Sequence, residues 1–159
     1  ALKSYEPGVI ISNQGGWQSQ AFNYGDAVDY HPVLNKVVEL LSEIELKKPV
    51  ENIIDITSWI NINGKHSYNE LHNHIGLCFS GVYYIKVPHG DCGTIGFKDP
   101  RPLVEGDFFF NQRYEGAGYY AYPPKEGMLL LFPGFIDHMV RSNRTDEDRI
   151  SLSFNVLLE

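Results

Sequence analysis

The sequence has few cysteines, no excess of positive charge and no long apolar run, and each shortage excludes a class of protein. The two cysteines, Cys78 and Cys92, are too few for a disulfide framework, so both are expected to be reduced. With 13 Lys and Arg against 20 Asp and Glu, the formal net charge is −7. We expect no nucleic-acid partner, because such binding requires a clustered positive surface. No apolar stretch approaches the roughly 20 residues of a membrane-spanning helix, so no membrane partner is expected.

The sequence also lacks internal repeats, linkers and a signal-peptide pattern. We therefore expect one domain over residues 1–159 and a cytoplasmic location. Because the first residue is Ala1 and not Met, we expect that the N-terminus is truncated. No residue pattern sets an oligomeric state, and a homodimer is the default only because it is the commonest assembly.

The apolar pattern predicts one helix followed by many short strands. Pro32 and the apolar residues that follow it at helical spacing predict a helix over about 32–47. From about 53 to 158, β-branched and aromatic runs alternate with Gly and Pro turns. Candidate strands lie at 53–63, 71–79 and 150–157. One helix and about eight strands favour a mainly β fold, a β-sandwich or jelly roll with helical support.

Three of the six histidines form a candidate metal site. His72 and His74 are two residues apart in the predicted strand 71–79, so both rings would point to one side, together with Glu70. His138 belongs to a later strand that a jelly roll would bring near them. Imidazole binds Fe, Zn, Cu and Ni. The alternative is a pair of surface histidines and one core histidine, which a His-x-His pattern alone does not exclude.

A candidate carboxylate site follows in the last predicted strand. Arg149 and Ser151 share one face of this strand, opposite the apolar Ile150 and Leu152. The hairpin between 138 and 149 would bring Arg149 near His138. A guanidinium with a nearby hydroxyl can bind a carboxylate through two hydrogen bonds. The alternative is a solvated polar face on an edge strand.

Several segments occur in a characteristic order and spacing. They are SNQGGWQS at 12–19, WININ at 59–63, HNH at 72–74, SGVYY at 80–84, GTIGFKDPR at 93–101, LFP at 131–133 and the stretch 138–155. In this order they resemble the Fe(II)- and 2-oxoglutarate-dependent oxygenases, over nearly the whole chain. The closest resemblance is to a subfamily of marine bacteria and phages that is related to prolyl hydroxylases, which implies the cytoplasm of a bacterium or of a phage-infected host.

The resemblance implies a double-stranded β-helix, the cupin-like jelly roll, with Fe(II), 2-oxoglutarate and O₂ as cofactor and cosubstrates. His138 matches the distal iron ligand of the family. Arg149 and Ser151 match its Arg-x-Ser motif, which binds the distal carboxylate of 2-oxoglutarate, and Tyr84 matches a tyrosine on the same carboxylate. Alternation along the strand favours Tyr84 over Tyr83 for this role. The implied reaction is hydroxylation of a substrate, with decarboxylation of 2-oxoglutarate to succinate and CO₂.

The chain departs from the family at the proximal metal motif, where His-x-Asp or His-x-Glu is usual and His72-Asn73-His74 stands instead. Three coordination patterns are open. His72, His74 and His138 can form a three-His site, which we prefer. His74 can be the proximal ligand, with Gly76 at the carboxylate position. One histidine can also coordinate together with the carboxylate of Glu70 or Asp99. Zinc also accepts a three-His site, so the metal is not fixed by these residues.

The sequence identifies the substrate only weakly. Asp99 and Arg101, near a strand end, and Trp59 and Asn61, on a predicted strand, are candidate substrate residues. The alternatives are a surface ion pair for the first two and plain core for Trp59. A peptide prolyl side chain, another peptide side chain or a small metabolite would all fit.

Two other functions compete with the oxygenase. One is a three-His cupin-like metalloenzyme without 2-oxoglutarate, and the other is a non-enzymatic β-sandwich binding module. The spacing of His138, Arg149 and Ser151 favours the oxygenase over both.

Overall fold

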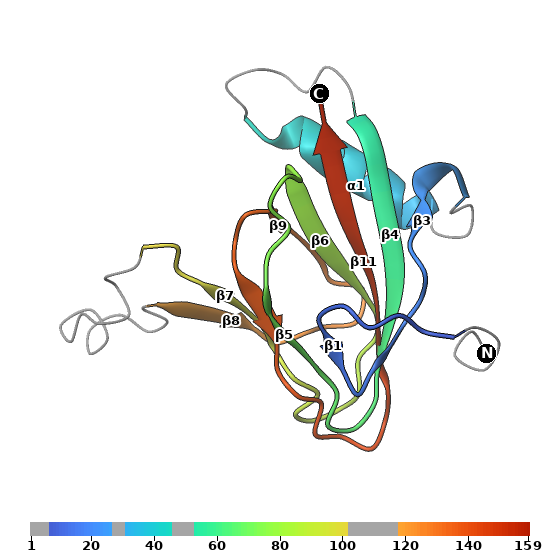
Figure 1. Cartoon of the computed structure of the whole chain (residues 1–159), viewed down its shortest axis with the longest axis vertical. Coiled ribbons are helices and arrows are strands. Elements are labelled where there is room, and N and C mark those ends of the chain that lie inside the picture. The colour runs from blue at the N-terminus through green and yellow to red at the C-terminus, as the bar shows by residue number, and fades with distance from the viewer. Residues whose placement is uncertain (1–6, 27–30, 46–52, 102–117) are drawn as a thin grey trace.

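Two antiparallel sheets make up most of the computed structural model (Figure 1). The structure describes residues 7–26, 31–45, 53–101 and 118–159. One sheet has the strand order β1-β5-β10-β7-β8, and the other has the order β2-β4-β11-β6-β9 with β3 paired to β4. The strands are β1 Asn13–Gln14, β2 Trp17–Gln18, β3 Phe22–Asn23, β4 Ile53–Asn63, β5 Tyr68–His72, β6 Phe79–Lys86, β7 Ile95–Lys98, β8 Tyr119–Tyr122, β9 Leu129–Pro133, β10 His138–Val140 and β11 Arg149–Leu158. The expectation of a mainly β fold is confirmed.

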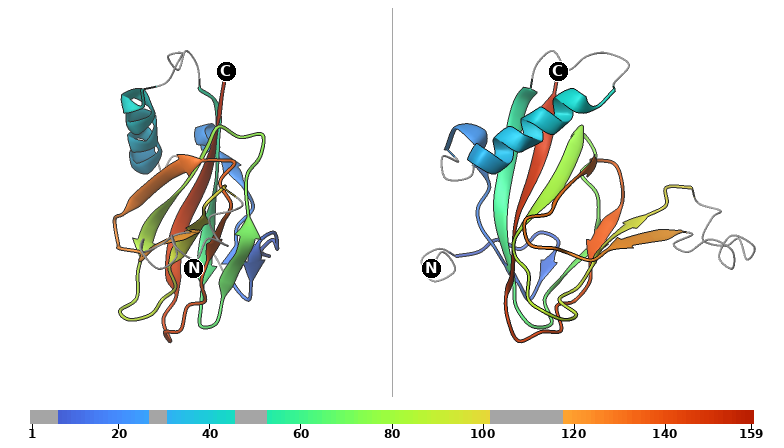
Figure 2. Two further views of the ribbon diagram at one scale, coloured as in Figure 1. Left: turned by 90° about the vertical axis from the view of Figure 1, so that its left-hand side faces the viewer. Right: turned by 180° about the vertical axis from the view of Figure 1, so that it is seen from behind.

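The helix α1, His31–Glu43, lies across the outer face of β4, β11 and β6 (Figure 2). Its residues Leu34, Val37 and Leu41 follow helical spacing and are almost fully buried, in one cluster with Leu152 and Phe154. It is the single α-helix in the described ranges. It corresponds to the helix predicted over 32–47, of which residues 46 and 47 lie outside the described ranges. A transmembrane helix is not found in the part of the chain that the structure describes.

Strict alternation along β11 separates an apolar face from a polar one. Ile150, Leu152 and Phe154 belong to the cluster under α1. Arg149 and Ser151 emerge on the other side and line the space between the sheets. The main apolar core therefore lies outside the sandwich, between α1 and the sheet, and much of the interior is polar. The alternation predicted for this strand is correct.

A second apolar cluster joins the two sheets directly. Val82 and Tyr84 of β6 and Phe132 of β9 pack against Ile95 of β7, which belongs to the opposite sheet. Burial of such side chains is worth about 1.5–3 kcal/mol each relative to exposure. This cluster closes part of the sandwich and leaves the polar region beside it open as a cavity.

The N-terminal segment connects the sheets a second time. β1 pairs with β5, with Asn13 opposite Asn69, while β2 pairs with β4 of the other sheet, with Trp17 opposite Ile62. The chain crosses between the sheets at Gly15, whose φ of 70° is in the left-handed region that favours glycine. The SNQGGWQS motif is thus the crossing that holds both sheets at this side of the molecule.

The prediction of one strand over 71–79 is wrong. β5 ends at His72, β6 begins at Phe79, and a turn with Gly76 at φ 97° lies between them. The ladder between β5 and β10 also shifts register between His138 and Val140. His72 and His74 therefore come together through a strand end and a turn, and not through alternation along one strand. The turn glycine is the signal that the sequence interpretation did not use.

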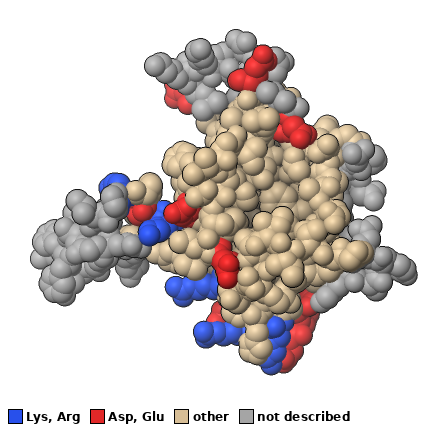
Figure 3. All heavy atoms as spheres, in the orientation of Figure 1, with Lys and Arg blue, Asp and Glu red and all other residues tan. Residues whose placement is uncertain are grey.

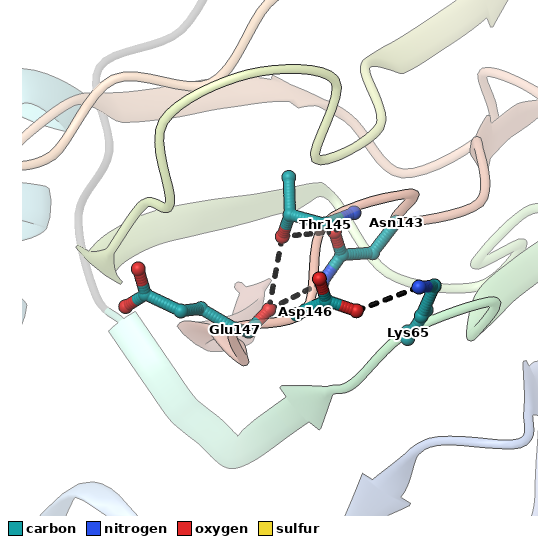
Figure 4. A network of polar contacts seen from close by, with 5 residues as sticks. All are labelled: Lys65, Asn143, Thr145, Asp146 and Glu147. Atoms are coloured by element: carbon teal, nitrogen blue, oxygen red, sulfur yellow. Dashed lines mark hydrogen bonds and ion pairs between the residues drawn. The ribbon is translucent and has the colours of Figure 1, made fainter.

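A buried amide organises the loop that leads into β11 (Figure 4). Asn143 has no exposed surface, and its Nδ2 donates to the carbonyls of Asn63 and Glu147 at 2.9 and 2.8 Å. Its Oδ1 accepts from the backbone N–H and the hydroxyl of Thr145. Nearby, Lys65 pairs with Asp146 at the surface at 2.6 Å. Residues 143–145 have the Asn-x-Thr pattern of a glycosylation acceptor, but in this fold both donors of the Asn143 amide are already in use.

Replacing Asn143 should destabilise the protein strongly. Asn143→Ala removes four hydrogen bonds and takes a buried donor away from the carbonyl of Asn63, and each buried group left unsatisfied costs about 1–3 kcal/mol. Urea unfolding followed by circular dichroism measures the change. The neighbouring Arg144→Ala is the control, because its 3.6 Å pair with Asp91 is exposed and worth at most about 1 kcal/mol. Equal stability of the two variants would contradict the assigned role.

Gly81 should not tolerate a methyl group. A Cβ at this position would lie 2.2 Å from Cζ of Phe154 and 2.5 Å from the carbonyl oxygen of Leu130. Overpacking of this kind typically costs about 1–3 kcal/mol, so Gly81→Ala should lower the free energy of unfolding by that amount. Gly25→Ala is a matched control, because no atom lies within 4 Å of its Cβ position. Thermal unfolding of both variants provides the comparison.

Candidate metal and carboxylate site

Three histidines meet between the two sheets. His72 is the last residue of β5, His74 lies in the turn after it, and His138 begins β10 opposite His72. One ligand nitrogen from each ring lies within 4.8 Å of the other two. The ring centroids are 4.3 Å apart for His72 and His138, and 5.1 and 5.2 Å from His74 to these two. Three converging imidazoles are a donor set for a divalent transition metal.

Backbone carbonyls fix the orientation of two of the rings. Nδ1 of His72 donates to the carbonyl oxygen of Glu70 at 2.7 Å, and Nδ1 of His138 donates to that of Ile136 at 2.9 Å. Because a carbonyl can only accept, Nδ1 carries the proton in both rings and Nε2 keeps its lone pair. The hydrogen bonds therefore favour, in both rings, the tautomer that leaves Nε2 free to bind a metal.

Burial keeps two of the three imidazoles, those of His74 and His138, uncharged. Desolvation, followed by repulsion from the charged forms of His138 and His72, lowers the pKa of His74 to about 4. Desolvation is also the main reason that the pKa of His138 falls to about 4, although its bond to the carbonyl of Ile136 acts in the opposite direction. Both imidazoles are therefore neutral at pH 7, which metal ligation requires.

Acidic side chains do not join the three rings within the described ranges. Glu70 is exposed and contributes its backbone carbonyl, not its carboxylate, through the bond to His72. Asp99 pairs with Arg101 at 2.6 Å, and these hydrogen bonds lower the pKa of Asp99 to about 2. Of the three coordination patterns left open by the sequence, the geometry favours the three-His set.

Asn73 links the turn after β5 to the segment that precedes β10. Its Nδ2 donates at 2.7 Å to Oδ1 of Asp137, the residue before His138. The backbone N–H of His74 also donates to the carbonyl of Gly134 at 2.7 Å. These two bonds hold the turn with the first two histidines against the segment that leads into β10. Asn73 is thus a positioning residue between the histidines.

Arg149 places a positive charge in the interior. It is 2% exposed, and its Nη1 donates to the carbonyls of Cys92 and Gly93 at 2.5 and 3.0 Å. Gly93 has φ 84°, and a Cβ there would lie 2.0 Å from the carbonyl oxygen of Arg141. Desolvation lowers the pKa of Arg149, with Tyr84 acting against the shift. Because no ion pair to Arg149 is found within the described ranges, the guanidinium needs an anionic partner.

Arg149 and the three histidines face one slot between the sheets. The slot contains about 540 Å³ of space, part of it open to solvent. Tyr84 and Ser151 are opposite each other on the β6–β11 ladder and both line it. Tyr83 instead packs against the cluster under α1, so the preference for Tyr84 agrees with the geometry. The slot thus combines a metal-type cluster with a buried cation, which suits a ligand that carries a carboxylate.

The sequence interpretation missed a chain of hydrogen bonds along this slot. Nδ2 of Asn63 donates to Asn69 at 3.2 Å, Asn69 donates to Oγ of Ser12 at 3.3 Å, and Ser12 lies 3.4 Å from Nε2 of His72. These hydrogen bonds lead from Asn63, which lies opposite Arg149 on β4, to the histidine cluster. The signal for Ser12 was its place in the SNQGGWQS motif, but no spacing rule connects that motif to His72.

The four candidate substrate residues divide into two pairs. Trp59 and Asn61 line the slot, and the ring of Trp59 lies 6.0 Å from that of His74. Nδ2 of Asn61 donates to Ser153 at 2.9 Å, whereas its buried Oδ1 has no partner and is available to a ligand donor. Asp99 and Arg101 are not among the residues that line the slot and bind each other instead. The structure therefore does not bring this second pair to the site.

The fold and the site together define a class of protein, a two-sheet β protein with a candidate three-His metal centre and a buried cation between its sheets. The structure is similar to a Pseudomonas putida prolyl-4-hydroxylase, with 12% identity, 99% of this chain and 79% of the other covered, and a TM-score of 0.69. It is also similar to HygX from Streptomyces hygroscopicus, solved with nickel and 2-oxoglutarate bound, with 11% identity, coverage of 98% and 74%, and a TM-score of 0.63.

A third similar structure is a prolyl hydroxylase from Trichoplax adhaerens in complex with a hypoxia inducible factor peptide. It shows 17% identity, coverage of 94% and 66%, and a TM-score of 0.62. These similarities establish a shared fold. A search of the curated proteins finds no match.

The family profile described as "Putative 2OG-Fe(II) oxygenase" matches residues 57–155. The chain therefore belongs to this family of 2-oxoglutarate and Fe(II) oxygenases, as the sequence resemblance predicted. The matched range contains all three histidines and Arg149. In this chain three histidines converge at the candidate metal site, where the sequence resemblance implies that most family members have a carboxylate ligand.

Loss of the Asn73 bond should weaken metal binding. Asn73→Ala frees the turn that carries His72 and His74 from Asp137, and loss of a ligand-positioning contact typically costs 10–100-fold in metal affinity. Titration with Co(II) against a chelator measures this affinity. Asp137→Asn is the matched control, because its side-chain oxygen still accepts from Asn73. An Asn73→Ala affinity equal to that of the unchanged protein would contradict the positioning role.

Proposed function

We propose that this protein is an Fe(II)- and 2-oxoglutarate-dependent dioxygenase that hydroxylates its substrate. In this proposal His72, His74 and His138 hold the metal, and Arg149 binds the distal carboxylate of 2-oxoglutarate. The observation that carries it is the buried guanidinium of Arg149, which faces the same slot as the three rings and has no acidic partner in the described part of the chain. A metal-binding diacid would satisfy both ends of the slot.

The residues present fit the metal and the cosubstrate. The metal, when bound, would supply O₂ activation coupled to conversion of 2-oxoglutarate to succinate and CO₂. Arg149, with Tyr84 and Ser151 beside it, would orient the diacid. Phe132 lies 4.8 Å from the ring of His138 and shields it from water. Most of the protein's contribution is thus positioning and exclusion of solvent.

We also propose that the substrate is a peptide side chain. Support comes from the similar prolyl hydroxylase that was solved with a peptide bound. Prolyl hydroxylation is the nearest analogy, and a fold carries such an analogy only as a guide. Trp59 and Asn61 would face the reacting group, since both line the slot.

A second candidate is a three-His metalloenzyme that uses no 2-oxoglutarate. It is favoured by one observation, the lack of an acidic ligand beside the three rings in the described ranges. In that enzyme Arg149 would bind an acidic substrate directly. A non-enzymatic binding module has less support, because it assigns no role to the imidazoles that backbone carbonyls orient.

The test is an anaerobic titration with Fe(II) followed by 2-oxoglutarate. A visible metal-to-ligand charge-transfer band should appear only when both are present, because it requires the diacid to chelate the metal. His138→Ala should abolish the band. Stoichiometric metal binding without a band would favour the second candidate, and a folded protein that binds no metal would leave only the binding module.

Arg149→Ala should raise the concentration of 2-oxoglutarate needed for the band. Loss of one member of a buried ion pair costs about 3–5 kcal/mol, which corresponds to a factor of roughly 100 or more in affinity at 1.4 kcal/mol per tenfold. Arg149→Lys should restore part of the affinity, because it keeps the charge but not the two parallel bonds. Unchanged dependence on 2-oxoglutarate in both variants would refute the assignment, and Fe(II) affinity serves as the internal control.

A further inference from the structure

A groove adjoins the slot and is not explained by metal or cosubstrate binding. It lies between the N-terminal segment 9–21 and strands β4 and β11, and it contains about 980 Å³ of space, part of it open to solvent. It shares His72, His74 and Trp59 with the slot but does not include Arg149. An occupant of the groove would therefore reach the histidine cluster without entering the carboxylate end of the slot.

Among the described residues, the groove has no Lys, Arg, Asp or Glu in its lining, which includes His72 and His74. Its other walls are apolar, or they carry amides and hydroxyls, and they include Val9, Ile11, Gln18, Gln20, Thr57 and Asn155. Figure 3 shows the same property on the surface, where described Lys, Arg, Asp and Glu leave a broad area over the N-terminal segment and β4 uncovered. A charged group that entered this groove would lose hydration and find no partner, which is costly.

Exposed apolar side chains belong to the groove wall or directly neighbour a wall residue in the sequence, and we call them the apolar rim. Ile11 belongs to the wall and is 72% exposed, and its neighbour Ile10 is 81% exposed. Ile75, the residue after His74, is 78% exposed. Apolar groups gathered at the mouth of a site are typical of a surface that contacts a ligand. The walls add hydrogen-bonding groups to this apolar rim, so the groove offers both kinds of contact that an extended peptide makes.

We infer that this groove is the substrate-binding site, and that it takes a peptide segment with uncharged side chains. The inference rests on the proposed oxygenase function and deepens it. The backbone amides of the peptide would pair with Gln18, Gln20 and Asn155, while an uncharged side chain would pass Trp59 toward the histidines. The N-terminal crossing is then part of the active site. Its SNQGGWQS motif would contribute to substrate binding in addition to joining the two sheets.

Size favours a peptide over a small metabolite. A ligand of a few heavy atoms would leave most of the groove filled with water. An extended chain covers apolar surface along its length, and each Å² removed from water is worth about 25 cal/mol.

The experiment uses the full chain loaded with Fe(II) and 2-oxoglutarate. Pools of random decapeptides, each with one central residue fixed as Pro, Leu, Gln, Lys or Glu, are added in air, and succinate formation is compared with the peptide-free rate. Pools with an uncharged central residue should stimulate succinate formation several-fold more than the Lys and Glu pools. Anaerobic formation of the charge-transfer band is measured in parallel to verify the loaded site.

Two variants that introduce opposite charges at one wall position of the groove test whether the peptide binds there. Gln20→Arg and Gln20→Glu should both abolish the peptide stimulation while the charge-transfer band stays unchanged. Ser42→Arg, on the exposed side of α1, is the control and should keep the stimulation. Stimulation of the unchanged protein by the Lys or Glu pool as strong as that by the uncharged pools would instead identify a charged substrate and overturn the inference.

Failure of the inference can be distinguished from failure of the proposed function. A normal band with no stimulation by any pool would overturn the peptide class and leave the oxygenase assignment standing. A missing band in the unchanged protein would overturn the oxygenase assignment and the inference with it. Stimulation by uncharged pools that is insensitive to both Gln20 variants would place the substrate outside this groove.

Discussion

The long pairing of β4 with β11 is the interaction on which the rest of the structure depends. The two strands pair from Arg149 opposite Asn63 to Leu158 opposite Ile53. Their alternation sends apolar side chains outward to α1 and polar side chains inward. Because the larger apolar cluster lies on the outer face, the space between the sheets can hold amides, hydroxyls and a guanidinium. The site is thus a consequence of where the core is located.

The chemistry of the site depends on charge balance. Three neutral imidazoles leave the charge of a divalent metal undiminished, whereas a set of two histidines and a carboxylate removes one unit. Arg149 adds another positive charge that its backbone partners orient but do not neutralise. Both features favour an anionic occupant of the slot. The adjoining groove has no Lys, Arg, Asp or Glu among its described lining residues, so the two cavities select for opposite properties in their ligands.

Much of the fold and part of the site could be predicted from the sequence. The mainly β fold, the family and the alternating strand with Arg149 were predicted correctly, because each depends on local periodicity or on motif order. The turn between His72 and Phe79 was missed, since the apolar residues on both sides of Gly76 suggested one continuous strand, whereas Gly76 adopts a positive φ within the turn. The contacts of Ser12 with Asn69 and His72 join residues about sixty positions apart, and no local pattern encodes them.

The sequence by itself determined the residue types available for chemistry, namely three histidines, one arginine in an alternating strand and a glycine-rich N-terminal motif. Only the tertiary structure decided which of them meet. Side chains separated by tens of residues become neighbours through strand pairing, as His72 and His138 do. Burial then fixes their charge, because desolvation keeps imidazoles neutral. The same side chains on an exposed strand would be solvated and would define no site.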